Sequence, residues 1–188
     1  MTQAPVIKCR TLVRYLVATL LVGLLVSMVS LSVIFPQEVQ AVVGMKAPEI
    51  TSSAWINSKA ASLSSLRGKV VLVEFWTFGC FNCRNVEPQV KEWHRQYADQ
   101  GLVVIGIHSP EFAYEKDVEA VTRYVRDHGI HYAVAVDNDF ANWNRFGNRY
   151  WPAMYVINKQ GVIRYVRVGE GGYRETERVI QTLLAEPQ

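Results

Sequence analysis

The chain has 188 residues, of which 49% are hydrophobic, and its 20 Lys and Arg against 17 Asp and Glu give a formal net charge of +3. This length suits one domain with a substantial hydrophobic core. The small charge excludes the strongly basic face that nucleic-acid-binding domains present, so we expect no nucleic-acid partner.

The chain begins with a basic leader and a long apolar run. Residues 1–14 include three basic side chains, and residues 15–35 contain no charged one. About 20 apolar residues suffice for a helix to span a bilayer, and positive charges before the span keep the N-terminus in the cytoplasm. We therefore predict a membrane anchor at 15–35, a linker at 36–43, and export of a domain at 44–188 to the periplasmic, extracytoplasmic or lumenal side. The alternative is a signal segment that is cleaved near Ala41 and leaves a secreted domain.

The first half of the exported domain predicts two strands and two helices. Residues 68–76 and 101–109 are short apolar runs rich in Val, Leu and Ile, which is typical of strands buried on both faces. Between them, apolar residues at spacings of four, three and four predict an amphipathic helix over 80–99, which Pro88 should kink. A similar stripe predicts a second helix over 115–128, ended by a glycine.

The second half predicts shorter elements. Residues 131–137 form a weak strand, and 139–147 a short helix or turn. Two runs of strand-forming residues at 153–158 and 162–169 are joined by a turn with a glycine, which predicts a hairpin. A last amphipathic helix covers 173–185. Strands that alternate with helices and end in a hairpin and a helix predict an α/β sandwich around a mixed sheet.

Cysteine spacing carries the main chemical signal. The three cysteines are Cys9, which falls in the leader and is interpreted as an incidental thiol, and the CxxC pair Cys80 and Cys83. A structural zinc site normally needs four Cys or His ligands, and no second CxxC or spaced histidine pair is present. A structural disulfide across two residues would restrict the unfolded chain very little. We therefore interpret the pair as a redox centre.

The predicted elements place this pair where a strand ends and a helix begins. A helix N-terminus presents unpaired N–H groups and the positive end of the helix dipole, which favour a thiolate. Such a position lowers the pKa of a cysteine from about 8.5 to about 7 or below. We expect Cys80 to be the attacking nucleophile and Cys83, one turn into the helix, to resolve the mixed disulfide.

Residues around this junction resemble the thioredoxin-like superfamily over nearly all of 44–186. The matches are an acid six residues before the first cysteine, a tryptophan at the strand end, a helix proline, a proline before a strand and a glycine after the last strand: Glu74, Trp76, Pro88, Pro152 and Gly169. The segments EFWTFGCFNC, HSPEF, DNDFANW, NRYWPAMYVIN and GEGGY are most similar to the thioredoxin-like domain of DipZ-type proteins, relatives of the TlpA and ResA group of thiol–disulfide oxidoreductases. The resemblance implies a thioredoxin-like fold, a central mixed sheet flanked by helices.

The resemblance also implies catalytic roles beside the two cysteines. A carboxylate in a buried strand is costly without a partner, and burial would raise the pKa of Glu74 and make it a proton acceptor for Cys83. Strand alternation could instead point Glu74 to solvent or to a structural partner, and it replaces the usual aspartate. Trp76 would shield the thiolate, although core packing explains it equally well.

A substrate groove follows from the same resemblance. It implies a cis bond before Pro152, which would face the cysteine pair, and the backbone next to this proline could then pair with an extended substrate chain. The predicted groove residues are Phe81, Asn82, Trp151 and Gly169.

The predicted function is that of a membrane-tethered thiol–disulfide oxidoreductase without a cofactor or metal. By resemblance, reduction of partner proteins is favoured over oxidation, and apocytochrome c is one candidate substrate. DipZ-type proteins often carry a multi-span membrane domain, whereas this chain has one apolar run, so a separate membrane protein would supply the electrons.

Two alternatives remain open. One is a copper- or metal-handling protein, in which Cys80, Cys83 and a histidine would be soft ligands. His108 is instead interpreted as an ordinary strand-end histidine rather than a proton shuttle or metal ligand. The other alternative is a thiol peroxidase, but the complete Pro-x-x-x-Thr-x-x-Cys spacing expected of that class is absent around Cys80.

Overall fold

The computed structural model describes residues 42–187. The predicted leader, the apolar segment at 15–35 and most of the linker lie outside these residues. Among the helices of 42–187, none has both the length and the hydropathy needed to cross a membrane.

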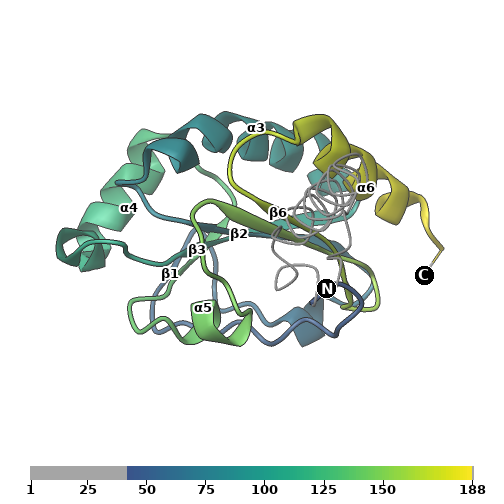
Figure 1. Ribbon diagram of the computed structural model, residues 1–188, viewed down its shortest axis with the longest axis horizontal. Coiled ribbons are helices and arrows are strands. Elements are labelled where there is room, and N and C mark those ends of the chain that lie inside the picture. The colour runs from purple at the N-terminus through teal and green to yellow at the C-terminus, as the bar shows by residue number, and fades with distance from the viewer. Residues whose placement is uncertain (1–41, 188) are drawn as a thin grey trace, which may run out of the picture. The chain divides into compact units, whose positions relative to one another are not determined.

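A six-stranded mixed sheet forms the centre of the domain, with strand order β1-β4-β3-β2-β5-β6 (Figure 1). The parallel pairs are β2 with β3 and β3 with β4, whereas β1, β5 and β6 each run antiparallel to a neighbour. The strands are β1 (Trp55–Ile56), β2 (Val70–Trp76), β3 (Leu102–His108), β4 (Ala133–Val136), β5 (Ala153–Ile157) and β6 (Ile163–Val168).

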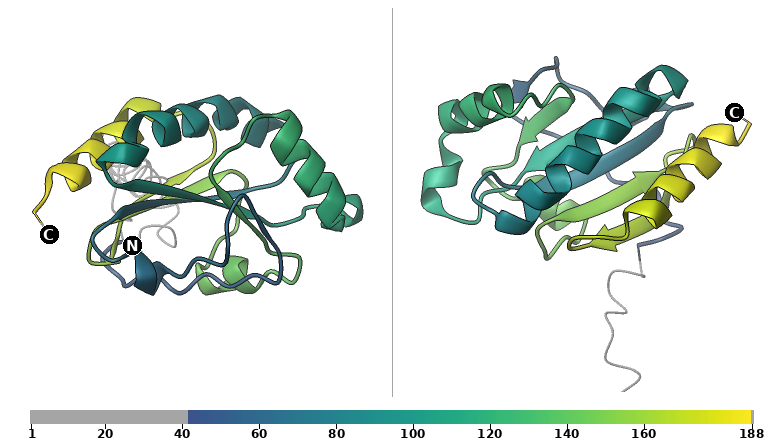
Figure 2. Two further views of the ribbon diagram at one scale, coloured as in Figure 1. Left: turned by 180° about the vertical axis from the view of Figure 1, so that it is seen from behind. Right: turned by 90° about the horizontal axis from the view of Figure 1, so that it is seen from above.

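Helices cover both faces of this sheet, as the two views of Figure 2 show. The helices α3, α4 and α6 lie on one face, and α5 lies on the other with the segment that precedes β2 (Figure 1). Their bounds are α3 (Phe81–Tyr97), α4 (Val118–Asp127), α5 (Ala141–Arg145) and α6 (Tyr173–Ala185), and three short 3-10 turns are η1 (Leu63–Leu66), η2 (Ala98–Gln100) and η3 (Ala113–Lys116).

The central strand β2 contributes to the core on both sides. Successive side chains of a strand point to opposite faces, and every residue of β2 is buried. Leu72 and Trp76 pack into the cluster that contains the apolar stripe of α3, whereas Val73 and Phe75 pack into the cluster on the α5 side. The alternation therefore places Glu74, between Val73 and Phe75, on the same face as α3.

The predicted elements are all present in the expected order, and the predicted mixed α/β architecture is confirmed. The helix predicted from residue 115 begins later, at Val118, because the Asp117 side chain caps it by accepting the Glu119 N–H at 2.9 Å. Residue 115 belongs to η3 instead. The two-residue strand β1 was not predicted, since two residues show no periodicity.

Truncation of the Trp93 side chain should test how much the α3 face contributes to stability. Trp93 is fully buried between the sheet and α6, with its ring 6.4 Å from that of Tyr173. Replacing a buried tryptophan by alanine leaves a cavity and costs about 3–5 kcal/mol. We expect Trp93→Ala to lower the free energy of unfolding by about this amount in equilibrium urea unfolding, and Gln96→Ala, on the exposed side of α3, to change it by less than about 0.5 kcal/mol.

Candidate active site

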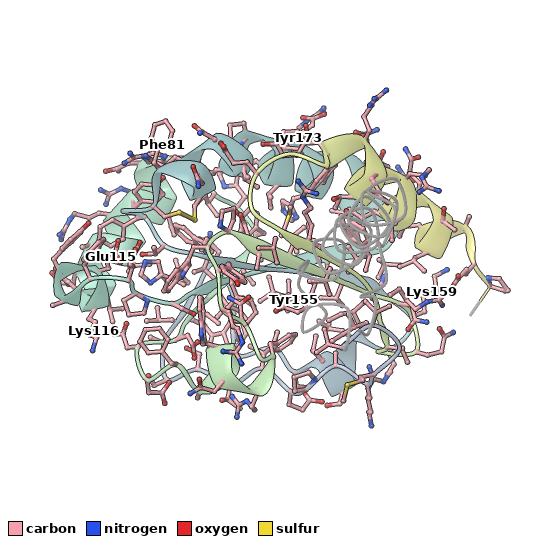
Figure 3. The ribbon with its side chains drawn as sticks, in the orientation of Figure 1. Phe81, Glu115, Lys116, Tyr155, Lys159 and Tyr173 are labelled. Atoms are coloured by element: carbon pink, nitrogen blue, oxygen red, sulfur yellow. A yellow bond between two sulfur atoms is a disulfide. The ribbon has the colours of Figure 1, made fainter. Side chains whose placement is uncertain are left out.

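The cysteine pair lies at the N-terminus of α3. Cys80 is the N-cap residue of this helix and is disulfide-bonded to Cys83, with their Cα atoms 5.3 Å apart. The Cys83 N–H donates to Cys80 Sγ at 3.2 Å. Cys83 is only 3% exposed, whereas Cys80 is partly exposed and is followed directly by Phe81 at the surface (Figure 3). A partner can therefore reach the sulfur of Cys80 but not that of Cys83.

The electrostatics at this point favour a thiolate on Cys80 when the pair is reduced. The N–H groups of the first helical turn have no partner inside the helix, and the dipole adds positive potential there. One of these groups already contacts Cys80 Sγ. The predicted strand-to-helix junction is thus confirmed in geometry, while the roles of the two cysteines remain a prediction.

A buried carboxylate lies on the α3 side of β2. Glu74 is 1% exposed and accepts a hydrogen bond from the Tyr132 hydroxyl at 3.3 Å. Burial raises the pKa of Glu74 to about 8; the Tyr132 hydrogen bond lowers it and the charge of Glu87 raises it further. Its expected burial is confirmed, and the alternative in which it points to solvent is wrong. Tyr132 is a structural partner of the kind that the other alternative named, and the role of Glu74 as a proton acceptor stays a prediction. A carboxylate with this pKa can exchange a proton with a thiol near neutral pH.

Trp76 and His108 form an aromatic layer beside the pair. The two rings meet edge-on with centroids 5.1 Å apart, and Phe78 stacks on His108 at 5.5 Å. Trp76 is buried in the core cluster that also contains Cys83. Thr77 Oγ1 lies 3.2 Å from His108 Nε2, and burial lowers the pKa of His108 to about 4. His108 is therefore neutral at neutral pH, which is poorly suited to a proton shuttle there.

No group of three or more His, Cys, Asp or Glu side chains within residues 42–187 is arranged to hold a metal ion.

The loop before β5 brings three predicted residues together. The Trp151–Pro152 bond is cis, as expected. The Gly169 N–H donates to the carbonyl oxygen of Pro152 at 2.8 Å. Trp151 Nε1 donates to the carbonyl oxygen of Ser109 at 2.9 Å, and the Ser109 N–H donates to that of Trp76 at 3.0 Å. This chain of bonds ties the cis-proline loop to the ends of β2 and β3, next to the strand end that leads to Cys80.

The buried Asp137, which was not predicted, binds residues that contact this loop. It is buried and accepts hydrogen bonds from Ser109 Oγ at 2.9 Å and from the N–H groups of Asn142 at 2.8 Å and Trp143 at 3.0 Å. Trp143 in turn lies against Trp151, with ring centroids 4.2 Å apart. Both tryptophans line a surface pocket of about 510 Å³, and of the predicted groove residues only Trp151 is part of this lining. The position of Asp137 directly after β4 was the sequence signal that could have indicated its role.

Glu115 is a second acid that the sequence did not single out. It is fully buried in η3, and its carboxylate accepts the N–H of Gly79, the residue before Cys80, at 3.0 Å.

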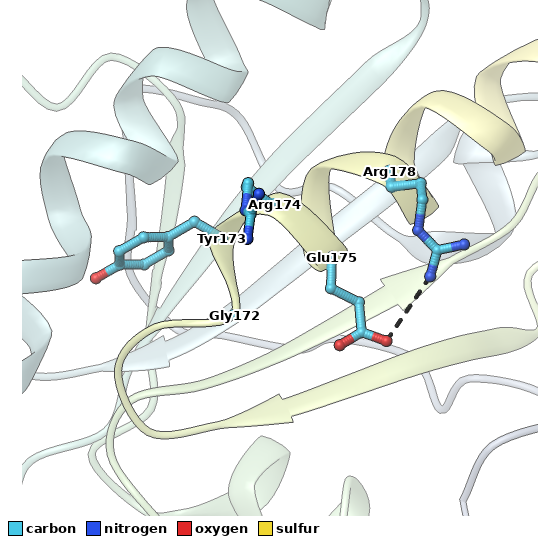
Figure 4. Close-up of a pocket in the computed structure, with 5 residues that line it drawn as sticks. All are labelled: Gly172, Tyr173, Arg174, Glu175 and Arg178. Atoms are coloured by element: carbon cyan, nitrogen blue, oxygen red, sulfur yellow. Dashed lines mark ion pairs between the residues drawn. The ribbon is translucent and has the colours of Figure 1, made fainter.

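A further surface pocket of about 590 Å³ lies at the start of α6 (Figure 4). An ion pair of 3.8 Å joins Glu175 and Arg178 along its edge. None of the predicted site residues lines this pocket, whose lining residues are Gly172, Tyr173, Arg174, Glu175 and Arg178.

Comparison with known proteins agrees with this geometry. Residues 43–166 match the model of the AhpC/TSA family. The chain is 44% identical over 142 residues to Protein DipZ of Mycobacterium tuberculosis, covering 73% of this chain and 20% of DipZ. It is 32% identical over 142 residues to the thiol-disulfide oxidoreductase YkuV of Bacillus subtilis, covering 75% of this chain and 95% of YkuV. The chain thus spans about a fifth of the length of DipZ but nearly all of YkuV.

Solved structures show the same fold. A thioredoxin-like protein in the oxidized form has a TM-score of 0.69 and 32% identity, covering 76% of this chain and 97% of that one. A thiol-disulfide isomerase from Corynebacterium glutamicum has a TM-score of 0.66 and 28% identity, covering 75% and 98%. The predicted thioredoxin-like fold is confirmed.

The raised pKa of Glu74 predicts a pH dependence of stability. Between about pH 4.5 and pH 8 the folded state keeps the Glu74 proton, whereas the unfolded chain has already released it. Stability falls with rising pH where the folded state binds more protons. We expect the wild-type protein to lose stability across this window relative to Glu74→Gln, as measured by thermal unfolding at several pH values. A constant difference between the two proteins over that range would contradict the raised pKa.

Proposed function

We propose that this chain, which belongs to the AhpC/TSA family of thioredoxin-like proteins, is a thiol–disulfide oxidoreductase that acts through Cys80 and Cys83. The observation that carries the proposal is the disulfide at the N-terminus of α3, with Cys80 accessible and Cys83 buried. Because of this difference in exposure, the sulfur of Cys80 can react with a partner, whereas the sulfur of Cys83 can react only with Cys80. YkuV, which matches 75% of this chain, is named a thiol-disulfide oxidoreductase, and one solved structure of the same fold is titled a thiol-disulfide isomerase.

The reaction runs in two exchange steps. The Cys80 thiolate attacks one sulfur of a partner disulfide, which forms a mixed disulfide and releases the other partner sulfur as a thiolate. The Cys83 thiol then loses its proton and attacks Cys80 Sγ, which forms the Cys80–Cys83 disulfide and releases the second partner sulfur. Two electrons pass from the cysteine pair to the partner, and the proton that Cys83 loses passes to Glu74 in the fraction of molecules in which that carboxyl is ionised.

Reduction of partner proteins is the proposed direction, and the substrates are protein disulfides or thiols. Phe81, 67% exposed beside the pair, and Trp151, partly exposed near the cis-proline, would contact a polypeptide that reaches Cys80. Asn82 and Gly169 complete this face, and the backbone next to Pro152, whose own carbonyl oxygen is bonded to Gly169, would pair with an extended substrate segment. Apocytochrome c is one candidate partner, by resemblance to the TlpA and ResA group.

Membrane tethering through 15–35 and electron supply by a separate membrane protein are part of the same proposal. The support is the uncharged run of 21 residues after a basic leader. Thiols in an oxidising compartment become oxidised, so a reductant there needs a continuous source of electrons.

A thiol peroxidase is the second candidate. One observation favours it: Thr77 precedes Cys80 by three residues, which is the Thr-x-x-Cys part of the expected pattern. Val73 occupies the position where that pattern has proline. The partial match places this candidate behind the oxidoreductase.

Replacement of Cys83 tests the two-step exchange. In Cys83→Ser the first step can occur but the second cannot, so turnover of protein disulfides such as those of insulin should fall to background. The variant should accumulate a mixed disulfide that non-reducing electrophoresis and mass spectrometry detect. Cys80→Ser is the control and should form no such adduct. Full turnover by Cys83→Ser, or consumption of hydrogen peroxide faster than of protein disulfides by the wild type, would favour the peroxidase instead.

The reduction potential of the pair tests the direction. We expect a value near that of thioredoxin, about −270 mV, from equilibration of the full chain in dithiothreitol and glutathione buffers. A value near about −120 mV, the range of a strong oxidant, would contradict the reducing direction. A pair that does not cycle, together with metal binding by the reduced protein, would favour the metal-handling alternative.

A further inference from the structure

The buried carboxylate of Glu115 lies against the redox loop. A carboxylate removed from water is stable only where hydrogen-bond donors surround it. Oε2 of Glu115 accepts the N–H groups of Glu111 at 2.5 Å and Phe112 at 2.9 Å, and Oε1 accepts the N–H of Gly79 at 3.0 Å. The first two bonds fix Glu115 within its own turn, at the place that Figure 3 marks. The third joins η3 to the loop before Cys80, 36 residues away in sequence.

The residue type at position 79 shows how close this approach is. A Cβ on Gly79 would overlap Oε1 of Glu115 and lie 2.5 Å from the Tyr114 hydroxyl oxygen. Gly79 is not among the glycines with positive φ, so its backbone conformation does not require glycine. The absence of a side chain is required by the space that the Glu115 carboxylate occupies.

The chemistry at Cys80 follows from this contact. In the reduced protein, the N-terminus of α3 stabilises the Cys80 thiolate. The negatively charged carboxylate of Glu115 disfavours this thiolate. It accepts the N–H of Gly79, the residue before Cys80, so a negative charge lies next to that residue and its N–H is already bonded. Burial keeps this interaction from being screened by salt. A less stabilised thiolate makes the reduced pair a stronger reductant, since stabilisation of the reduced form is what makes a pair oxidising.

We infer that Glu115 is a positioning residue that fixes the loop before Cys80 and makes the cysteine pair more reducing by destabilising the Cys80 thiolate. The inference rests on the proposed thiol–disulfide exchange and names the group that sets its direction.

Other ionisable groups around the loop differ from Glu115 in exposure or charge. His108, on β3, is neutral near pH 7 because burial lowers its pKa to about 4. Tyr114 is neutral there as well, since desolvation and the neighbouring Glu115 raise its pKa. Arg84 on α3 and Glu111 before η3 are exposed, so solvent and salt screen their charges.

Glu115→Gln in the full chain, purified in mild detergent, tests the inference. The substitution removes the charge and keeps one oxygen that can accept the Gly79 N–H. The ultraviolet absorbance of the thiolate as a function of pH should show a thiolate-to-thiol ratio of Cys80 that is about tenfold higher at a given pH. Equilibration with dithiothreitol above the pKa of Cys80 should shift by the same factor toward the reduced pair, or about 30 mV. Glu74 and Arg84 are unchanged in both proteins, so their contributions cancel in the comparison.

Two further variants make the test specific. Glu111→Gln is the same chemical change in the same segment, but at an exposed side chain, and should alter the ratio by less than twofold. Glu115→Asp keeps the charge but moves it one methylene away from Gly79, and should give an increase of two- to threefold. Circular dichroism establishes that each variant is folded, and Glu115→Asp carries the test if the glutamine variant does not fold.

The outcomes separate this inference from the proposed function. A folded Glu115→Gln with the ratio and potential of Glu111→Gln would overturn the inference and leave Glu115 a purely structural residue, even if the wild type cycles normally. A Glu115→Asp ratio no higher than that of the wild type would overturn it in the same way. A wild-type pair that does not cycle would instead overturn the proposed function.

Discussion

The contact between the N-terminus of α3 and the sulfur of Cys80 is the interaction on which the rest of the site depends. It exists because β2 ends at Trp76 and the chain turns within a few residues into a helix whose first free N–H groups face the cysteine. The helix axis is held in place by its apolar stripe, which packs on the same face of β2 that carries Glu74. The core of the domain thus determines both where the proposed nucleophile, Cys80, lies and which side of the sheet the proposed proton acceptor, Glu74, occupies.

Two buried acids on different elements have distinct environments in this site. Glu74 lies within β2 and bonds to Tyr132, and its proton affinity is raised because burial disfavours the charged form. Glu115 lies in η3, where three backbone N–H groups bond to its carboxylate. The first is suited to exchange a proton with Cys83, and the second to oppose the thiolate at Cys80. Burial with a single side-chain donor raises the pKa of Glu74, whereas three backbone N–H donors hold the carboxylate of Glu115 in place.

Local patterns were sufficient to predict most of the fold. Apolar runs of strand-forming residues and helical stripes gave the order of the strands and helices, and the position of the CxxC pair between two of them gave the chemistry. Glu74 was also predictable, because a carboxylate in the middle of an apolar strand needs an explanation. These signals all lie within a few residues of the feature that they predict.

Glu115 and Asp137 were not predicted, because the residue that links each of them to the site, Gly79 for the first and Ser109 for the second, is distant in sequence. Glu115 stood at the start of the helix predicted over 115–128, and only the tertiary structure brings it to Gly79. Asp137 likewise binds Ser109, 28 residues earlier. In the structure, Gly79 marks this contact, because its φ is not positive and a Cβ there would overlap the Glu115 carboxylate. Glu115 does not react in the proposed chemistry, so its influence is seen only through the residue that it contacts. The group that fills the space beside Gly79 is what identifies it.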